Sequence, residues 1–207
     1  MVQHTGYIGW RTDCITDSFY DRTSAGQPIA GRITDTGGKT WTVTDGSDWQ
    51  VFPHGTAAAL SNWPVVTQIA AAYVVTSFAD GTIHADVSPI GESNNPAFRD
   101  GLIFRHVDND NFWVFFNYRS PGGTLQYYLR CYSGGALVYD SGALTAGVRD
   151  TGGPIPLEVI LSGSSIKAYY DGVLRQDITN STHLSAVNHG VNSLQYGVSY
   201  FSACPAA

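Results

Sequence analysis

The chain has 207 residues, 43% of them hydrophobic, and a formal net charge of −6. This length suffices for one well-buried domain, and the hydrophobic content is that of a folded protein. The negative charge and the lack of a basic run argue against nucleic-acid binding, because clustered Lys and Arg bind phosphates. No stretch approaches the roughly 18 apolar residues that a membrane-crossing helix requires. The N-terminal residues 1–5 show neither the basic nor the apolar region of a secretory signal.

The pattern along the chain indicates one β-rich domain. Residues 1–16 show little periodicity and are expected to form a connecting segment or an edge strand, whereas residues 17–207 contain no repeat or linker that would divide them. Apolar runs of strand length alternate with turn residues, which predicts about 12–14 strands and no helix longer than one turn. The predicted fold class is an all-β, antiparallel two-sheet β-sandwich of the jelly-roll type.

Several elements can be assigned in chain order. Residues 41–44 and 49–52 are predicted to form a hairpin, and a buried strand is expected within residues 67–78. Toward the C-terminus, Asp171-Gly172 predicts a tight hairpin turn, and residues 195–202 are expected to supply the closing strand.

The most informative stretch is residues 99–141, which contains four short apolar runs. Three clusters of turn residues separate them, at 108–111, 120–123 and 133–135. Clusters of Asn, Asp, Gly and Pro of this kind close β-hairpins. This stretch therefore predicts a four-stranded antiparallel meander.

Pairing the meander at its turns sorts its side chains into two faces, because successive side chains alternate across a strand. The predicted register pairs Phe104 with Phe115 and Tyr118 with Leu125. The predicted core face contains Ile103, Arg105, Val107, Phe112, Val114, Phe116, Tyr118, Leu125, Tyr127, Leu129 and Cys131. The second face contains Leu102, Phe104, His106, Trp113, Phe115, Asn117, Gln126, Tyr128, Arg130, Tyr132 and Tyr139. Because a buried guanidinium must be paired, Arg105 is expected to pair with an Asp.

The second face mixes aromatic rings with amide, imidazole and guanidinium groups. Sugars need this mixture, because their C–H patches stack on rings and their hydroxyls require planar donors and acceptors. The predicted ligand-binding residues are His106, Trp113, Phe115, Asn117, Gln126, Tyr128, Arg130, Tyr132, Tyr139 and the loop residue Trp63. The alternative is that a loop or another subunit covers this face.

Three cysteines lack the spacing of a metal site. Cys131 falls on the predicted core face and is expected to be an inert buried thiol. Cys14 and Cys204 lie near the two termini, where strands of a sandwich are often neighbours. The sequence leaves open whether these two cysteines form a disulfide.

Acidic residues near the N-terminus are candidates for a structural calcium site. Asp13, Asp17 and Asp21 offer the carboxylate oxygens that calcium prefers. The acidic residues within 108–110 are instead explained by a β-turn. No other cofactor is expected.

The sequence offers little for catalysis. Retaining glycosidases need two carboxylates about 5–5.5 Å apart, and the only glutamates are Glu92 and Glu158. Asp residues beside turns could substitute, namely Asp86, Asp100 and Asp140. A lyase site would combine a Tyr/His pair with a group that neutralises a uronate, a role open to His106, Gln126, Tyr128 and Arg130.

Several motifs together resemble the concanavalin A-like lectin/glucanase superfamily, particularly its laminin-G-like jelly rolls. Residues 17–22 (DSFYDR) and 35–43 (DTGGKTWTV) are similar to the opening D-x-F-x-R and D-T-G-G-x-W-x-V motifs of such domains. Residues 101–112 (GLIFRHVDNDNF) and 166–172 (IKAYYDG) are similar to two of their hairpins. The resemblance implies recognition of glycans or proteins in some members and glycan cleavage in others. The Glu-x-Asp-x-Glu pattern of the glucanase branch is missing here.

Domains of this appearance recur in minor tail and fibre proteins of actinobacterial phages. We therefore predict a non-catalytic carbohydrate-recognition module that binds a cell-surface glycan or polysaccharide, located in a virion tail or fibre or outside the cell, with other tail subunits as further partners. The first alternative is a structural or oligomerisation domain of a virion assembly. The second is a polysaccharide lyase or glycoside hydrolase.

Overall fold

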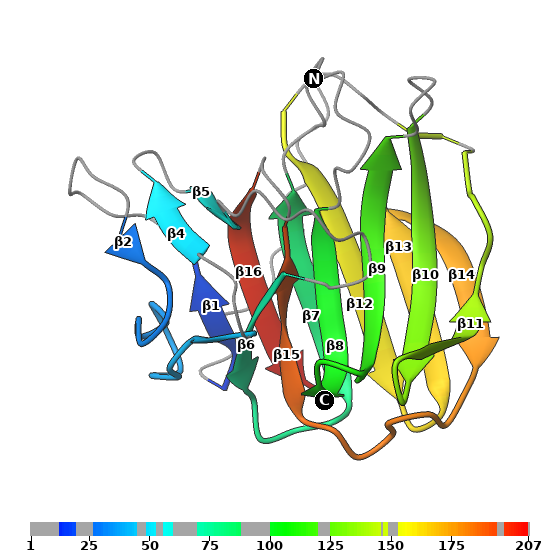
Figure 1. Ribbon diagram of the computed structural model, residues 1–207, viewed down its shortest axis with the longest axis horizontal. Coiled ribbons are helices and arrows are strands. Elements are labelled where there is room, and N and C mark those ends of the chain that lie inside the picture. Colours follow the sequence, from blue (N-terminus) through cyan, green and yellow to red (C-terminus); the bar gives the residue numbers. More distant parts are fainter. Residues whose placement is uncertain are drawn as a thin grey trace.

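The computed structural model describes residues 13–19, 27–44, 49–52, 56–59, 70–87, 100–119, 125–145, 147–148, 153–193 and 197–206. These residues form two antiparallel sheets and no helix, so none of them belongs to a helix that could cross a membrane. The two sheets pack as two layers (Figure 1), and their facing apolar side chains form one large core. The predicted all-β sandwich is confirmed.

One sheet has nine strands and the other has seven. The nine-stranded sheet runs in the order β14-β13-β12-β7-β16-β5-β4-β2, and β1 also pairs with β16. Its strands are β1 (Ile15–Asp17), β2 (Gln27–Pro28), β4 (Trp49–Phe52), β5 (Thr56–Ala59), β7 (Gly81–Val87), β12 (Ile155–Ser162), β13 (Ser165–Tyr170), β14 (Val173–Thr179) and β16 (Val198–Pro205).

The seven-stranded sheet runs in the order β11-β10-β9-β8-β15-β6-β3. Its strands are β3 (Thr42–Val43), β6 (Ala71–Val75), β8 (Gly101–Asp108), β9 (Asn111–Arg119), β10 (Leu125–Ser133), β11 (Ala136–Asp140) and β15 (Asn188–Asn192). The predicted meander is confirmed, because β8 to β11 are consecutive neighbours in this sheet.

Strict alternation explains why the central strands bury one face. In β7, Ile83, Ala85 and Val87 are fully buried while the residues between them are half-buried. The neighbouring strand β12 repeats this pattern, burying Leu157 and Val159. A fully buried Val, Leu or Ile stabilises a fold by about 1.5–3 kcal/mol relative to its exposed state, so the two strands anchor the nine-stranded sheet to the core.

Local patterns predicted one turn correctly and one hairpin wrongly. Asp171 and Gly172 have φ values of 51° and 74°, the left-handed geometry of a tight two-residue turn between β13 and β14. In contrast, residues 41–44 and 49–52 do not form a hairpin, since β3 pairs with β6 and β4 pairs with β2 and β5. Both segments carry strand-forming residues, but they belong to different sheets, and Trp41 and Trp49 are both buried in the core.

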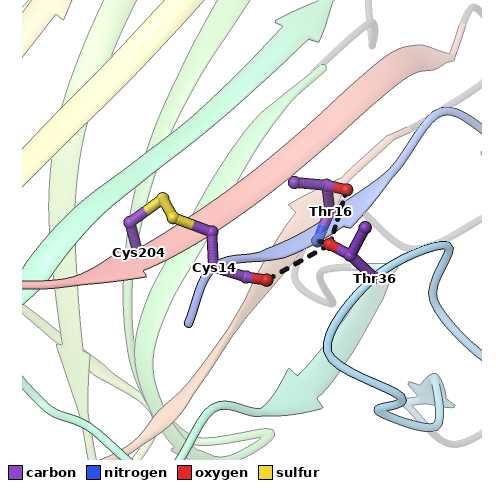
Figure 2. The surroundings of a disulfide bond; sticks show 4 residues. All are labelled: Cys14, Thr16, Thr36 and Cys204. Carbon is purple, nitrogen blue, oxygen red and sulfur yellow. Dashed lines mark hydrogen bonds between the residues drawn. A yellow bond between two sulfur atoms is a disulfide. The ribbon is translucent and has the colours of Figure 1, made fainter. Parts of the chain in front are cut away.

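The first and last strands are joined covalently. β1 lies antiparallel to β16, with Ile15 opposite Ala203, which brings the Cα atoms of Cys14 and Cys204 to 4.3 Å and allows a disulfide. Thr36 reinforces this corner, because its hydroxyl donates to the carbonyl of Cys14 and accepts from the amide of Thr16 (Figure 2). The disulfide therefore links β1 covalently to β16 at the corner where these two strands pair.

The third cysteine behaves as predicted. Cys131 is a free, fully buried thiol in β10. Burial raises its pKa to about 12, and a thiol that stays protonated at neutral pH is a poor nucleophile.

A buried arginine ties the two sheets together at one end of the sandwich. The Arg105 side chain is fully buried, and its Nη2 lies 3.3 Å from Oδ1 of Asp80, which precedes β7. The same nitrogen donates to the carbonyl of Gly163 in the β12–β13 turn. The expected pairing of Arg105 with an Asp is confirmed.

Replacement of Asp80 should expose the cost of that buried charge. In Asp80→Ala, the guanidinium loses its counter-ion, and we expect the free energy of unfolding to fall by about 3 kcal/mol in urea denaturation. The matched control is Asp177→Ala, which removes the partner of Lys167 from an exposed ion pair between β13 and β14; it should cost less than about 1 kcal/mol. Equal losses in both variants would contradict this role.

Removal of the disulfide should destabilise the fold, because the bridge closes a long loop of the chain and restricts the unfolded state. The two cysteines are 190 residues apart, so Cys14→Ala combined with Cys204→Ala should lower the free energy of unfolding by about 2–4 kcal/mol. Dithiothreitol should lower the urea midpoint of the wild type to that of the double variant. If the reductant leaves the wild-type midpoint unchanged, the bridge does not constrain the chain.

Candidate functional site

The candidate site lies on the face of the seven-stranded sheet that points away from the nine-stranded sheet, which we call the outer face. Its apolar residues form a cluster separate from the main core. Strand alternation and pairing place the following side chains there: Tyr73, Ile103, His106, Phe112, Val114, Phe116, Tyr118, Gln126, Tyr128, Arg130, Tyr132 and Asp140. The face is thus lined by rings, with polar groups concentrated on β10 and β11.

The structure divides the predicted ligand-binding residues into two groups. Five of them lie on the outer face, namely His106, Gln126, Tyr128, Arg130 and Tyr132. Four point between the sheets instead, namely Trp113, Phe115, Asn117 and Tyr139. The predicted facing of these four is therefore wrong, and Trp63 lies outside the described residues.

Membership of the core between the sheets decides the facing of the misassigned residues. Trp113 and Phe115 belong to the main core cluster, and Asn117 pairs with Tyr127 of that cluster. Phe116 is also only 2% exposed, but it belongs to the separate cluster of the outer face. Trp113 also donates from Nε1 to the carbonyl of Thr182 at 3.0 Å, which holds the loop after β14 against the core. These side chains pack the sandwich and do not present themselves to a ligand.

A one-residue slip explains the error. Tyr118 pairs with Gln126 instead of Leu125, and Phe116 pairs with Tyr128 instead of Tyr127. Because side chains alternate with a period of two, this slip moves β8 and β9 to the opposite face relative to β10. Ile103, Val114 and Phe116, predicted for the core, consequently lie on the outer face.

A bulge in β8 explains why His106 lies on the outer face, as predicted, although the facing predicted for Ile103 of the same strand is wrong. Phe104 pairs with Trp113 and Asp108 with Asn111, which leaves three residues of β8 opposite one residue of β9. Arg105 has a φ of 46°, an unusual value for a residue with a side chain. The bulge turns Arg105 into the interior and His106 outward.

A pocket opens at one end of the outer face. It has a volume of about 200 Å³ and is lined by Phe116, Tyr118, Tyr128 and Arg130. The rings of Phe116 and Tyr128 are nearly parallel, with centroids 5.5 Å apart, and Tyr118 meets Tyr128 edge-on at 5.9 Å. Cross-strand pairing of β9 with β10 builds this aromatic wall.

Arg130 supplies the polar side of the pocket. Its guanidinium carbon lies 4.4 Å from the centroid of the Tyr128 ring, a cation–π contact. Its Nη2 forms an ion pair with Asp140 of β11, at 3.1 Å from Oδ2. Tyr128 donates from its hydroxyl to Oε1 of Gln126 at 2.7 Å. Donors, acceptors and ring faces thus lie side by side.

His106 marks a second position on the outer face. Its ring lies 4.5 Å from that of Tyr73 and 6.3 Å from that of Phe112. The side chain is 2% exposed, and neither ring nitrogen has a hydrogen-bond partner among the residues that the structure describes. Burial lowers the pKa of His106 to about 4, so the ring is neutral at pH 7.

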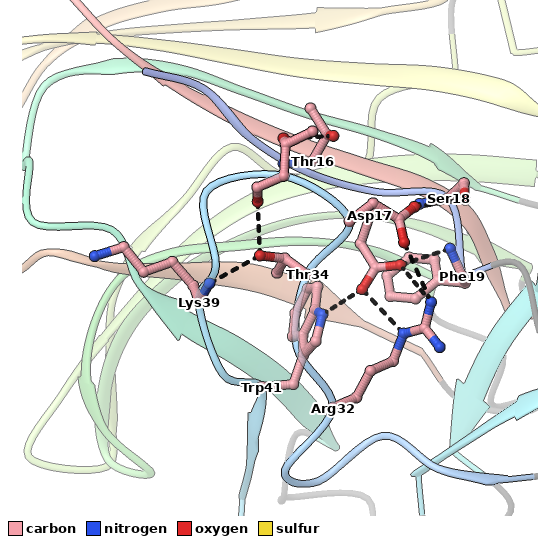
Figure 3. Close-up of polar contacts among 10 residues, drawn as sticks. Thr16, Asp17, Ser18, Phe19, Arg32, Thr34, Lys39 and Trp41 are labelled. Atoms are coloured by element: carbon pink, nitrogen blue, oxygen red, sulfur yellow. Dashed lines mark hydrogen bonds and ion pairs between the residues drawn. The ribbon is translucent and has the colours of Figure 1, made fainter. Parts of the chain in front are cut away.

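Asp17, a predicted calcium ligand, instead anchors the N-terminal segment. Its fully buried carboxylate accepts hydrogen bonds from Trp41 Nε1 at 2.7 Å and from the amide of Phe19 at 2.8 Å. Arg32 donates to both carboxylate oxygens at 3.1 Å (Figure 3). A carboxylate already neutralised by a guanidinium does not fit a calcium site.

The remaining metal candidates are not grouped with further metal ligands in the described part of the chain. Asp13 is exposed, and Asp21 lies outside the described residues. Asp108 closes a turn by accepting from the Asp110 amide and the Asn111 side chain at 2.9 and 2.7 Å. Among the described residues, no three His, Cys, Asp or Glu side chains are grouped as metal ligands would be.

Carboxylates are scarce on the outer face. Of the side chains described there, Asp140 carries the carboxylate nearest the pocket, and it is ion-paired. Glu158 lies in β12, opposite His84 of β7, and therefore belongs to the other sheet. Glu92 lies outside the described residues. The described part of the pocket thus lacks the pair of carboxylates that a retaining glycosidase requires.

Sequence reasoning missed four aromatic residues of the outer face. Phe112, Phe116 and Tyr118 were assigned to the core, and Tyr73 lay in a strand predicted only as buried. The alternation of residues 112–118 groups Phe116 with Tyr118 correctly; the error lies in which face of that strand was chosen. The polar residues of β10 mark the solvent side, because Gln126 and Arg130 are costly to bury unpaired.

The architecture is shared with known carbohydrate-active proteins. The fold is similar to a β-glucanase of Bacillus licheniformis, with a TM-score of 0.62 and 11% identity over 93% of this chain and 98% of that one. It is also similar to a pseudo β-1,3-glucanase of Mycobacterium tuberculosis, with a TM-score of 0.56 and 11% identity over 93% and 98% of the two chains. A third similar structure is a carbohydrate-binding module from Bacillus subtilis, with a TM-score of 0.52 and 13% identity over 84% and 92%.

These likenesses define the fold as a concanavalin A-like jelly roll. No protein-family model matches the sequence, and no curated protein matches it. At such low identities, the likeness concerns architecture alone, and function must be argued from the site.

Two buried histidines should make the protein sensitive to acid. Burial lowers the pKa values of His106 and His189 to about 4, whereas unfolded histidine titrates near 6.5. The unfolded chain therefore binds more protons between these values, and the free energy of unfolding should fall as the pH drops from about 6.5 to about 4. In urea titrations across this range, His106→Phe should show a shallower decline than the wild type. An unchanged decline would contradict this assignment.

Proposed function

We propose that the protein is a non-catalytic carbohydrate-recognition module that binds a glycan on its outer face. The observation that carries the proposal is the pocket formed by the rings of Phe116, Tyr118 and Tyr128 beside the guanidinium of Arg130. Its volume of about 200 Å³ accommodates a single sugar ring rather than a large ligand.

The chemistry of the pocket matches the two sides of a pyranose ring. Aromatic faces such as that of Tyr128 pack against C–H groups, and desolvation of both surfaces favours the contact. Hydroxyl groups both donate and accept hydrogen bonds. Arg130 offers donors, and Gln126 and Asp140 offer amide and carboxylate groups along the same edge. The fold's occurrence in a carbohydrate-binding module supports the proposal.

Two observations favour binding over catalysis. Asp140 is ion-paired with Arg130, and a retaining hydrolase needs a second carboxylate close by. The residues named for a lyase do not converge, because His106 is buried between Tyr73 and Phe112 while Tyr128 packs beside Phe116. A base and an acid that share no substrate position cannot act together.

The proposed setting is the tail or fibre of a virion, where the module would bind a host cell-surface glycan. The sequence resemblance to minor tail and fibre domains supports this setting. The disulfide between Cys14 and Cys204 is in keeping with an oxidising, extracellular location.

A structural role in an assembly is the second candidate. Leu137 and Val138 are 46% and 53% exposed on β11, the edge strand of the seven-stranded sheet. An edge with exposed apolar side chains favours pairing with another chain. Sedimentation equilibrium would support this candidate by showing a stable oligomer that Val138→Lys dissociates.

Removal of pocket side chains should weaken glycan binding. On a glycan array followed by titration calorimetry, Tyr128→Ala and Arg130→Ala should each weaken binding at least about 10-fold, the range expected for losing one aromatic or charged anchor. The matched control is Tyr169→Ala, which removes a half-buried tyrosine from the outward face of the other sheet. It should bind as the wild type does.

The folded state of each variant is checked by its thermal midpoint. Binding that survives both pocket substitutions, or that Tyr169→Ala removes equally, would contradict the proposed site.

A further inference from the structure

We propose that the pocket selects neutral sugars and discriminates against uronates and other acidic sugars. The inference rests on the proposed function and names the class of ligand that the same site takes. It follows from how the charge of Arg130 is compensated.

The guanidinium of Arg130 is not an available positive charge. Asp140 lies across from it in the β10–β11 pair, and the ion-paired atoms are 3.1 Å apart. Both side chains are only partly exposed, with 21% and 32% of their surfaces accessible. The pair therefore stays close to the pocket wall, and the negative charge of Asp140 lies beside the positive charge of Arg130.

An acidic ligand gains little from such a pair. Coulomb energy depends on distance, so a carboxylate placed beside Arg130 would be attracted by the guanidinium and repelled by Asp140 to a similar extent. It would also lose part of its hydration on entering a pocket lined by rings. An attraction that is nearly cancelled does not offset the lost hydration of the carboxylate.

A neutral sugar suits the pair better. Two neighbouring hydroxyls can accept from a guanidinium N–H and donate to a carboxylate oxygen at the same time. Arg130 and Asp140 present these two kinds of group side by side, and the amide of Gln126 lies on the same strand face. The arrangement recognises a diol without needing a ligand charge.

The described surroundings of the pocket add no second cation. Among the side chains that the structure describes on the outer face, Arg130 is the only Lys or Arg. His106 is buried, and its pKa of about 4 leaves it neutral at pH 7. The described outer face thus carries no excess positive charge to attract an acidic polysaccharide.

The test compares neutral and acidic polysaccharides on the intact protein. Glucans, mannans and galactans form the neutral set; polygalacturonate, alginate and hyaluronate form the acidic set, each at 20 and 500 mM NaCl. The wild type should bind within the neutral set, with an affinity that changes less than about twofold between the two salt concentrations. Binding to the acidic set should be at least about 10-fold weaker.

Asp140→Asn is the diagnostic variant, because it leaves the shape of the pocket and removes the negative charge beside Arg130. Its affinity for polygalacturonate at 20 mM NaCl should rise at least about fivefold over the wild type and fall again at 500 mM NaCl, as expected for a screened ionic contact. Asp177→Asn is the matched control. It frees Lys167 on the other sheet from its pair, at 3.7 Å, and should not change binding.

The outcomes separate the inference from the function on which it rests. If the wild type prefers an acidic glycan, with a salt dependence that Arg130→Ala removes, the inference is overturned and the recognition function stands. The inference also fails if Asp140→Asn gains no affinity for polygalacturonate. If no glycan of either set binds the wild type, the proposed function itself fails, and the inference with it.

Discussion

The burial of Arg105 is the constraint on which the arrangement of both sheets depends. A guanidinium is too costly to leave unpaired in an interior, so the chain must bring partners to it. Those partners come from Asp80 before β7 and from Gly163 between β12 and β13. The backbone amide of Arg105 donates to Nδ1 of His189 in β15. One residue of the seven-stranded sheet thereby holds the β6–β7 connection and the β12–β13 turn of the nine-stranded sheet.

The same residue shapes the candidate site. Arg105 enters the interior only because β8 bulges there, with a left-handed φ of 46°. The bulge reverses the facing of the next residue and delivers His106 to the outer face, whereas Phe104 remains in the core. Bulges that re-aim a side chain next to a functional surface are a common use of this irregularity. Stability and the composition of the outer face are therefore linked at one position.

The outer face shows how a common fold can carry different activities. Similar jelly rolls include a β-glucanase, a pseudo β-1,3-glucanase and a carbohydrate-binding module, so the sandwich itself does not decide between cleavage and binding. In this chain, the decision depends on the side chains of β9 to β11. Rings occupy β9 and β10, and the carboxylate of Asp140 is committed to Arg130. Among the side chains that the structure describes on this surface, there is no pair of free carboxylates of the kind that a retaining glycosidase requires.

The sequence by itself determined the class of fold, the meander, the tight turn at Asp171-Gly172, the buried thiol of Cys131 and the need of Arg105 for an acidic partner. Each follows from local chemistry: strand period, turn residues and the cost of burying a charge or a polar group. The polar residues of β10 could also be placed outward, since Gln126 and Arg130 resist burial.

Only the tertiary structure decided which face of β8 and β9 is the core. Both faces of these strands are rich in rings, so hydrophobicity did not distinguish Trp113 from Phe116, and the register between β9 and β10 settles their facing. The pairing of β3 with β6, the identity of Asp80 as the counter-ion, and the meeting of Cys14 with Cys204 likewise depend on segments that are separated along the chain. Such pairings arise from how whole sheets stack, which no local pattern encodes.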